Sequence, residues 1–256
     1  MLKTRVIPTL LYKELGLVKG KAFDSRRAVG SPVQAISVYE RRDVDELIFL
    51  DVGATLQGRS PDYDLIDRLA DGSFMPLTVG GGVTTADEVG RLLEVGADKV
   101  CLGTAAVESP HVVESAANRF GSQCVVAAVD WRFSEHGGSA VVWTHSGTKP
   151  TDLSPQAVAR RLEGAGAGEI IATCIDRDGM MKGYDLDNLA KVTSAVRIPV
   201  IASGGAGKYQ DFLRAIEEAS ANAVAAGSMF LFTEQTPREA RAFLARHGVP
   251  VRGLEP

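Results

Sequence analysis

The stretch Leu77-Thr78-Val79-Gly80-Gly81-Gly82 leads from an apolar, strand-like segment into a turn of glycines. A second stretch, Ile201-Ala202-Ser203-Gly204-Gly205-Ala206, repeats this pattern 123 residues later, counted from Gly81 to Gly204. Each is followed by a helical pattern and then by another apolar run, which ends in Gly103-Thr104 or Gly227-Ser228. Self-similarity at a long, fixed offset indicates internal duplication. The chain is therefore predicted to consist of two related halves.

Short apolar runs alternate with amphipathic stretches along the whole chain. We predict strands near residues 5–11, 46–52, 75–79, 98–102, 124–130, 169–175, 199–203 and 223–227. Most of these runs are apolar throughout, as expected of parallel strands that are covered on both faces. Eight strand–helix units in 256 residues predict an α/β fold, a (β/α)8 TIM barrel built of two fused half-barrels. A doubly wound open sheet is the alternative.

No linker-like stretch divides the chain, so a single barrel domain over residues 1–256 is predicted. Two segments interrupt the rhythm: a long loop at 12–30 and an inserted hairpin at 131–149. Loops after barrel strands lie on the catalytic face, which makes both segments candidate lids. Helix starts are predicted where a hydroxyl residue precedes a proline, as at Ser60-Pro61 and Thr236-Pro237, and at the Thr85 and Glu88 capping box.

The composition excludes several classes of protein. A net charge of -4 gives no general attraction to nucleic acid or to an anionic membrane, and no apolar run is long enough to span one. The three cysteines are far apart and odd in number, which predicts free thiols in the cytoplasm. No cluster of ligands points to a metal, and we expect no cofactor.

The duplicated glycine turns predict phosphate binding. Backbone N–H groups at a glycine turn approach an anion closely, and a hydroxyl residue at a helix N-terminus adds a further donor. The two candidate cradles consist of Gly81, Gly82, Gly103 and Thr104 in the first half and Gly204, Gly205, Gly227 and Ser228 in the second. We therefore expect a small molecule that is phosphorylated at both ends; glycines that serve only tight turns are the alternative.

The first and fifth strands differ at one decisive position. Val125-Val126-Ala127-Ala128-Val129-Asp130 ends in an acid, whereas Val6-Ile7-Pro8-Thr9-Leu10-Leu11 ends in a leucine. If these two ends face each other across one pocket, Asp130 lacks a carboxylate partner and Leu11 takes its place.

These features belong to a wider resemblance. The chain resembles the cyclase subunit of imidazole glycerol phosphate synthase, an enzyme of histidine biosynthesis, nearly from end to end. The motifs that carry it include Arg5-Val6-Ile7-Pro8, Asp45-Glu46-Leu47-Ile48-Phe49-Leu50-Asp51, Gly96-Ala97-Asp98-Lys99-Val100, Phe120-Gly121-Ser122-Gln123, Asp176-Arg177-Asp178-Gly179 and Gly183-Tyr184-Asp185. In that family, ammonia from a glutaminase subunit passes through the barrel. It then attacks a bis-phosphorylated ribulosyl aminoimidazole carboxamide, which gives imidazole glycerol phosphate and a carboxamide ribotide.

The resemblance assigns roles to residues at both ends of the barrel. It implies general acid–base catalysis by Asp130 with a partner that is lost at Leu11, and it shows a further departure at Gly103, where the cyclases carry asparagine. It implies a salt-bridged ammonia gate of Arg5, Glu46, Lys99 and Glu169, and partner docking at Asp98 and Gln123. The remaining candidates for substrate binding are Lys19, Asp51, Ser146, Thr173, Asp178 and Gly179. A structural plug is the alternative for the ring, and surface pairing is the alternative for Lys19, Asp51 and Asp178.

The missing acid leaves the function open. A subgroup of paralogues lacks this aspartate and carries segments like Pro8-Thr9-Leu10-Leu11 and Gly16-Leu17-Val18-Lys19. By that resemblance the chain forms a heterodimer with a HisH-like glutaminase subunit and passes ammonia to a sugar amidotransferase that makes acetamidino sugars. A working cyclase of histidine biosynthesis is the main alternative. A non-catalytic regulatory barrel and an isomerase of the sister family are the others.

Overall fold

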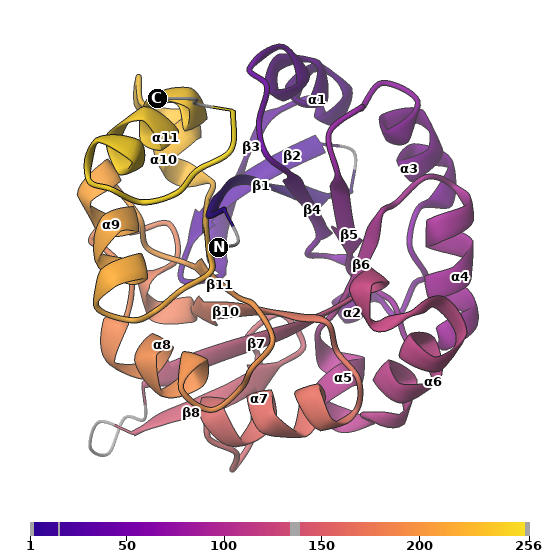
Figure 1. Cartoon of the computed structure of the whole chain (residues 1–256). Helices are drawn as coiled ribbons and strands as arrows, with labels where there is room; N and C mark the ends of the chain where they lie inside the picture. The colour runs from indigo at the N-terminus through magenta and orange to yellow at the C-terminus, as the bar shows by residue number, and fades with distance from the viewer. Residues whose placement is uncertain (1–2, 15, 134–138, 254–256) are drawn as a thin grey trace.

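The computed structural model describes residues 3–14, 16–133 and 139–253. Eight parallel strands form a closed barrel, with helices packed around its outside (Figure 1). The barrel strands are β1 (Arg5–Lys13), β4 (Leu47–Asp51), β5 (Leu77–Gly80), β6 (Lys99–Leu102), β7 (Val125–Phe133), β10 (Glu169–Cys174), β11 (Val200–Ser203) and β12 (Ala223–Ala226). This confirms the predicted (β/α)8 barrel and excludes the open sheet.

The barrel closes between its first and last strands. Residues 5–8 of β1 pair in parallel with residues 223–226 of β12, and the other side of β1 pairs with β4. The N-terminal strand therefore lies between segments from opposite ends of the chain, as Figure 1 shows. Since the sheet has no free edge along this path, every barrel strand has two neighbours.

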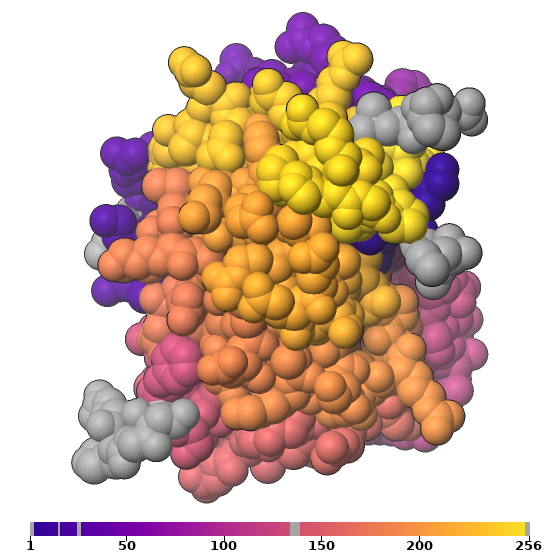
Figure 2. Space-filling view, turned by 60° about the vertical axis from the view of Figure 1, so that its left-hand side comes forward, coloured from indigo at the N-terminus to yellow at the C-terminus, as the bar shows by residue number. Residues whose placement is uncertain are grey.

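The helices carry the apolar faces that cover the barrel. They are α1 (Pro32–Arg41), α2 (Ala54–Gln57), α3 (Tyr63–Ala70), α4 (Ala86–Glu94), α5 (Thr104–Glu108), α6 (His111–Phe120), α7 (Pro155–Gly164), α8 (Leu186–Thr193), α9 (Tyr209–Glu217), α10 (Ser228–Phe232) and α11 (Pro237–Arg246). The 3-10 turns η1 (Ser122–Cys124) and η2 (Ile175–Arg177) precede β7 and follow β10. Segments of the second half, orange to yellow, form most of the surface in the view of Figure 2. Among the described residues, no helix has the length and apolar composition needed to cross a membrane.

The duplication is visible in the way helices begin. Helices α3 and α8 are both capped by an aspartate whose carboxylate accepts a backbone N–H, Asp62 from Leu65 and Asp185 from Asn188. Both α4 and α9 carry an acid, Glu88 or Asp211, at the third position. Because capping side chains fix where a helix starts, equivalent caps hold equivalent loops in the two halves.

The segment expected as a long loop at 12–30 is instead ordered into strands. Strand β1 continues to Lys13, and β2 (Gly16–Lys21) and β3 (Asp24–Gly30) form an antiparallel hairpin that pairs with it. Within the segment predicted as an inserted hairpin at 131–149, the extended end of β7 pairs with β8 (Ala140–Thr144), which pairs with β9 (Lys149–Pro150). The part of that hairpin at residues 134–138 lies outside the described residues.

One predicted helix start was wrong. Ser60-Pro61 does not begin a helix, because α3 starts at Tyr63 with Asp62 as its cap. The Ser60 hydroxyl instead donates to Glu88 at 2.8 Å, so it links the loop before α3 to the first turn of α4 rather than capping the helix that follows it.

Candidate active site

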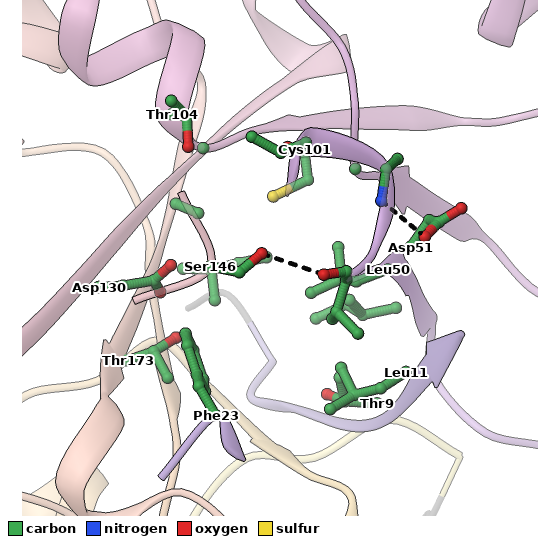
Figure 3. Close-up of a pocket in the computed structure, with 18 of the residues that line it drawn as sticks. Thr9, Leu11, Phe23, Leu50, Asp51, Cys101, Thr104, Asp130, Ser146 and Thr173 are labelled. Carbon is green, nitrogen blue, oxygen red and sulfur yellow. Dashed lines mark hydrogen bonds between the residues drawn. The ribbon is translucent and has the colours of Figure 1, made fainter. Parts of the chain in front are cut away.

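A cavity of about 570 Å³ lies at the carboxyl ends of the barrel strands. Its walls come from all eight barrel strands or the loops that follow them, together with the β2–β3 hairpin and the β8–β9 turn. In Figure 3, Leu11 and Thr9 lie on one side of this cavity, and Asp130 and Thr173 lie on the opposite side. The ends of β1 and β7 therefore face each other across one cavity, as expected from the sequence.

Asp130 is one of the acids that line this cavity. Burial raises its pKa to about 7; a hydrogen bond with Thr173 acts in the opposite direction, and the nearby charge of Asp178 raises it further. A carboxyl group that titrates near neutral pH can both accept and donate a proton under physiological conditions. Asp130 is thus the described residue that is best suited to general acid–base chemistry here.

Leu11, near the end of β1, supplies an apolar wall on the side of the cavity opposite Asp130. It is only 9% exposed, it lines the cavity, and its neighbour across the sheet is Leu50, which also lines it. The next residue, Tyr12, points to the outer face of the strand, where its ring lies 5.6 Å from that of Phe49. Tyr12 therefore cannot replace the missing acid, as the alternation of side chains along a strand predicts.

The first candidate cradle is shaped by two glycines that no other residue can replace without strain. Gly81 has φ +107°, and a Cβ atom there would lie 2.1 Å from the carbonyl oxygen of Asp51. Gly82 has φ +74° and faces the carbonyl oxygen of Arg59 in the same way. Gly103 differs, because its backbone is not left-handed and a Cβ would find its nearest neighbour at 3.9 Å. The hydroxyl of Thr104 accepts the backbone N–H of His145 at 2.8 Å.

The second candidate cradle contains a buried lysine. Lys19, on β2, is 4% exposed, and a Cβ atom on Gly227 would lie 1.9 Å from its Nζ atom. Burial lowers the pKa of Lys19, and the charge of Asp178 opposes this effect. Gly204, Gly205 and Ser228 complete the lining of this end. The β2–β3 hairpin thus places a cation directly at the second glycine turn.

The loop after β10 holds that hairpin over the cavity. The carbonyl of Asp178 accepts the backbone N–H of Ala22 at 2.9 Å. Gly179 has φ +72°, and a Cβ atom there would lie 2.0 Å from the carbonyl oxygen of Gly20. The close approach of the two backbones requires a glycine at this position.

Asp51 and Ser146 are occupied by contacts within the protein. The Asp51 carboxylate accepts the backbone N–H groups of Gly53 and Ala54 and forms a 2.7 Å ion pair with Arg59. The Ser146 hydroxyl donates to the carbonyl of Val52 at 3.1 Å, a contact drawn in Figure 3. Both residues line the cavity, so these contacts fix the position of its walls.

At the opposite end of the barrel, four charged side chains form a closed ring. Glu46 pairs with Arg5 at 2.5 Å and with Lys99 at 3.0 Å; Glu169 pairs with Lys99 at 3.0 Å and also with Arg5. The Thr78 hydroxyl donates to Glu46 at 2.7 Å. Both carboxylates are buried, and their pairing with two cations offsets the cost of that burial.

Comparison with known proteins agrees with this geometry. A protein-family model described as "Histidine biosynthesis protein" matches residues 5–236. The chain is 47% identical to imidazole glycerol phosphate synthase subunit HisF of Caulobacter vibrioides, over 98% of this chain and 97% of that protein. The same subunit of Hyphomonas neptunium is 47% identical, over 98% of this chain and 99% of that protein. The chain belongs to the HisF family. These relatives are named as subunits, so each is part of a complex.

In this HisF-family chain, the two predicted docking residues lie at the same end of the barrel as the ring. Asp98 immediately precedes β6, and Gln123 lies in η1, which precedes β7; both are exposed. The Asp98 carboxylate accepts the backbone N–H of Leu77 at 2.8 Å, and the Gln123 amide donates to the carbonyl of Phe120 at 3.3 Å. Both side chains therefore support the local backbone, and their role in docking stays a prediction.

The residues of the HisF-family cavity that were missed from the sequence include Thr9, Phe23 and Arg59. The Thr9 hydroxyl is buried and has no hydrogen-bond partner among the described atoms. Phe23 has a left-handed backbone (φ +63°) and lies beside Thr173 in Figure 3. The alternation along β1, in which Thr9 and Leu11 share a face, would have identified Thr9.

Proposed function

We propose that this HisF-family barrel receives ammonia from a glutaminase subunit at the charged ring and conducts it to an acceptor outside its own cavity. The acceptor belongs to a downstream amidotransfer reaction, such as the formation of an acetamidino sugar. One observation carries the proposal: the ring is complete, whereas the cavity at the other end presents Leu11 opposite Asp130.

The interior between the two ends suits a small neutral molecule. Its side chains are apolar or weakly polar: Ile7, Ile48, Cys101, Val126, Ile171, Ile201, Ala223 and Ala225. Ammonia can pass such a lining without the desolvation cost that an ammonium ion would incur. The four paired charges supply polar contacts at the entrance, and Lys99 is a side chain that can move, because its stem is flexible.

The proposed loss of cyclisation follows from the chemistry at Leu11. General acid–base assistance by a side chain is typically worth about 10²–10⁴ in rate. The same strand offers no substitute, since Tyr12 lies outside the barrel. Lys19 lies on β2, which pairs with the end of β1, but the glycine turn at Gly227 and the charge of Asp178 surround its ammonium group. The cavity would then bind a phosphorylated ligand, or close on it, without turning it over at a useful rate.

A working cyclase is the second candidate, and a specific observation favours it. Both glycine turns and Asp130 are retained in a cavity of about 570 Å³, in a chain that is 47% identical to named HisF subunits. In this case Lys19, which lines the same cavity, would have to supply the second proton-handling group.

One assay separates the two candidates. The purified protein is supplied with ammonium and the bis-phosphate substrate of the cyclase, and imidazole glycerol phosphate is measured. We expect turnover at least about 100-fold below that of an ordinary HisF subunit, because one of two proton-transfer groups is absent. Turnover within tenfold of an ordinary subunit, abolished by Lys19→Met, would establish the cyclase and exclude the conduit.

A further inference from the structure

The loop before β5 exposes a phenylalanine that takes no part in the hydrophobic core. Phe74 is 92% exposed, whereas the other large apolar side chains that are exposed among the described residues lie between 36% and 50%. Single apolar side chains that are partly exposed are common on protein surfaces and need no explanation. Phe74 stands apart from them, because nearly all of its surface faces water.

The backbone around Phe74 is held firmly. The Glu40 carboxylate of α1 accepts the backbone N–H groups of Phe74 at 3.0 Å and of Met75 at 3.2 Å. The Ser73 N–H donates to the carbonyl of Ala70 at 3.0 Å, and the Ser73 hydroxyl donates to the carbonyl of Met75 at 3.1 Å. A phenylalanine side chain has only two torsions, so a ring on such a fixed loop loses little conformational entropy when a partner covers it.

The second half of the barrel repeats this support with a different side chain. The Glu163 carboxylate of α7 accepts the backbone N–H groups of Arg197 at 2.7 Å and of Ile198 at 3.1 Å. The offset is 123 residues, counted from Glu40 to Glu163 and from Phe74 to Arg197, as it is for the glycine turns. Equivalent loops therefore present an aromatic ring in the first half and an exposed guanidinium group in the second.

Phe74 lies at the end of the barrel that carries the charged ring. It precedes β5, whose first residue, Leu77, donates its backbone N–H to the exposed Asp98 carboxylate at 2.8 Å. Asp98 is followed by Lys99, a member of the ring, and Lys99 is the neighbour of Thr78 across the sheet. A protein that covers the ring from the side of β5 and β6 therefore meets Phe74.

We infer that Phe74 anchors the glutaminase subunit on this barrel, and that the subunit receives the ring in an apolar, uncharged pocket. A few buried aromatic side chains contribute most of the binding energy of an interface, and charged groups are depleted at its centre. Since the equivalent loop carries Arg197, the contact is strongest on the first-half side of the charged ring.

A second copy of this chain is the alternative occupant. Symmetric pairing through Phe74 would bring the exposed carboxylates of Asp71 and Asp98 in one copy towards those of the other. Repulsion between like charges disfavours such a dimer. The inference rests on the glutaminase partner in the proposed function, but it does not depend on where the ammonia goes.

The test measures binding of the whole barrel to the HisH-type glutaminase of the same organism, by calorimetry without glutamine or ammonia. Phe74→Ala removes the ring, and Phe74→Leu keeps a smaller apolar side chain. Arg197→Ala is the matched control, because it shortens an exposed side chain on the equivalent loop. Sedimentation equilibrium of the barrel alone reports self-association.

We expect Phe74→Ala to weaken binding tenfold or more, Phe74→Leu to weaken it less than Phe74→Ala, and Arg197→Ala to change it less than threefold. All three variants should retain the circular dichroism of the wild type, because the replaced side chains are exposed and the backbone contacts remain.

Four results would each overturn the inference: no binding of the wild type at about 100 µM, a loss below tenfold in Phe74→Ala, equal losses in Phe74→Ala and Arg197→Ala, or self-association that Phe74→Ala abolishes. The affinities involve neither nitrogen transfer nor cyclisation. If the cyclase assay shows ordinary turnover, the conduit proposal fails and the role of Phe74 in docking is unaffected.

Discussion

Replacing Asp130 with asparagine should stabilise the protein, and the gain should grow with pH. The carboxyl group has a pKa of about 7 in the folded protein, against an ordinary value of 3.8 for an aspartate. Between these values the folded state holds a proton that the unfolded chain has lost, so stability falls as pH rises towards 7. The shifted pKa of Asp130 then destabilises the folded state by about 4 kcal/mol at pH 8 and by about 2 kcal/mol at pH 5. The pH-dependent part is the difference, about 2 kcal/mol.

Water in the cavity reduces this figure, because Asp130 lines an open space rather than a sealed core. We therefore expect Asp130→Asn to gain about 1 to 2 kcal/mol more in free energy of unfolding at pH 8 than at pH 5. The assay is equilibrium urea unfolding at pH 5, 6.5 and 8. Asp152→Asn, which removes one negative charge from the exposed surface, is measured in parallel as the control. A gain that is the same at both pH values within about 0.5 kcal/mol would show that burial does not raise the Asp130 pKa.

Three further changes test the cavity, the ring and the glycine turns. Leu11→Asp should raise turnover of ammonium and the bis-phosphate substrate about 10²-fold or more, because it restores a proton-transfer group opposite Asp130. Leu11→Asn is the control, and equal activity of the two variants would contradict the reasoning. Lys99→Ala should destabilise the protein by about 1–3 kcal/mol, because Glu46 and Glu169 then share one cation. It should also raise the ratio of glutamine hydrolysed to nitrogen transferred in the glutaminase complex. An unchanged ratio, or the same change in Lys99→Arg, would argue against a gate. Gly81→Ala should lower the free energy of unfolding in urea by about 2 kcal/mol or more, because of the left-handed backbone at Gly81 and the clash with Asp51. Gly103→Ala should lower it by less than about 1 kcal/mol. Similar losses in the two variants would contradict the backbone geometry at these glycines.

Much of the barrel could be predicted because its strands are continuous apolar runs. Segments such as 47–51 and 169–174 are buried on both faces, so apolar residues follow one another along them instead of alternating with polar ones. The capping box of Thr85 and Glu88 is local in sequence, and it forms as predicted. The glycine turns could be found for the same reason, since a left-handed backbone needs no distant information.

The β2–β3 hairpin could not be predicted in this way. Its turn passes through Ala22 and Phe23, which have φ values of +50° and +63°, so it lacks the glycine or asparagine that signals a hairpin. Contacts from far along the chain hold it: Asp178 accepts the N–H of Ala22, and the Arg132 guanidinium donates to the Ala22 carbonyl at 3.1 Å. Tertiary contacts of this kind override local preference.

The candidate site also combines features that the sequence predicts with features that depend on tertiary contacts. The opposition of Leu11 and Asp130 follows from strand order alone, and the structure places them across one cavity. The placement of Lys19 against Gly227 depends on how the hairpin folds over the mouth. Likewise, Ser60 donates to Glu88 instead of capping α3, because Asp62 is closer to the first free N–H groups of that helix.

The pairing of β1 with β12 has a consequence for biosynthesis. Strand β1 has one of its two neighbours at residues 223–226, so its hydrogen bonds on that side must wait until all the segments between them have been translated. Glu46 and Lys99 appear early, but Glu169, the fourth member of their ring, follows 70 residues after Lys99. Nascent chains thus carry exposed sheet edges and unbalanced charges for most of their synthesis, and chaperones that shield such edges would be their natural first contacts.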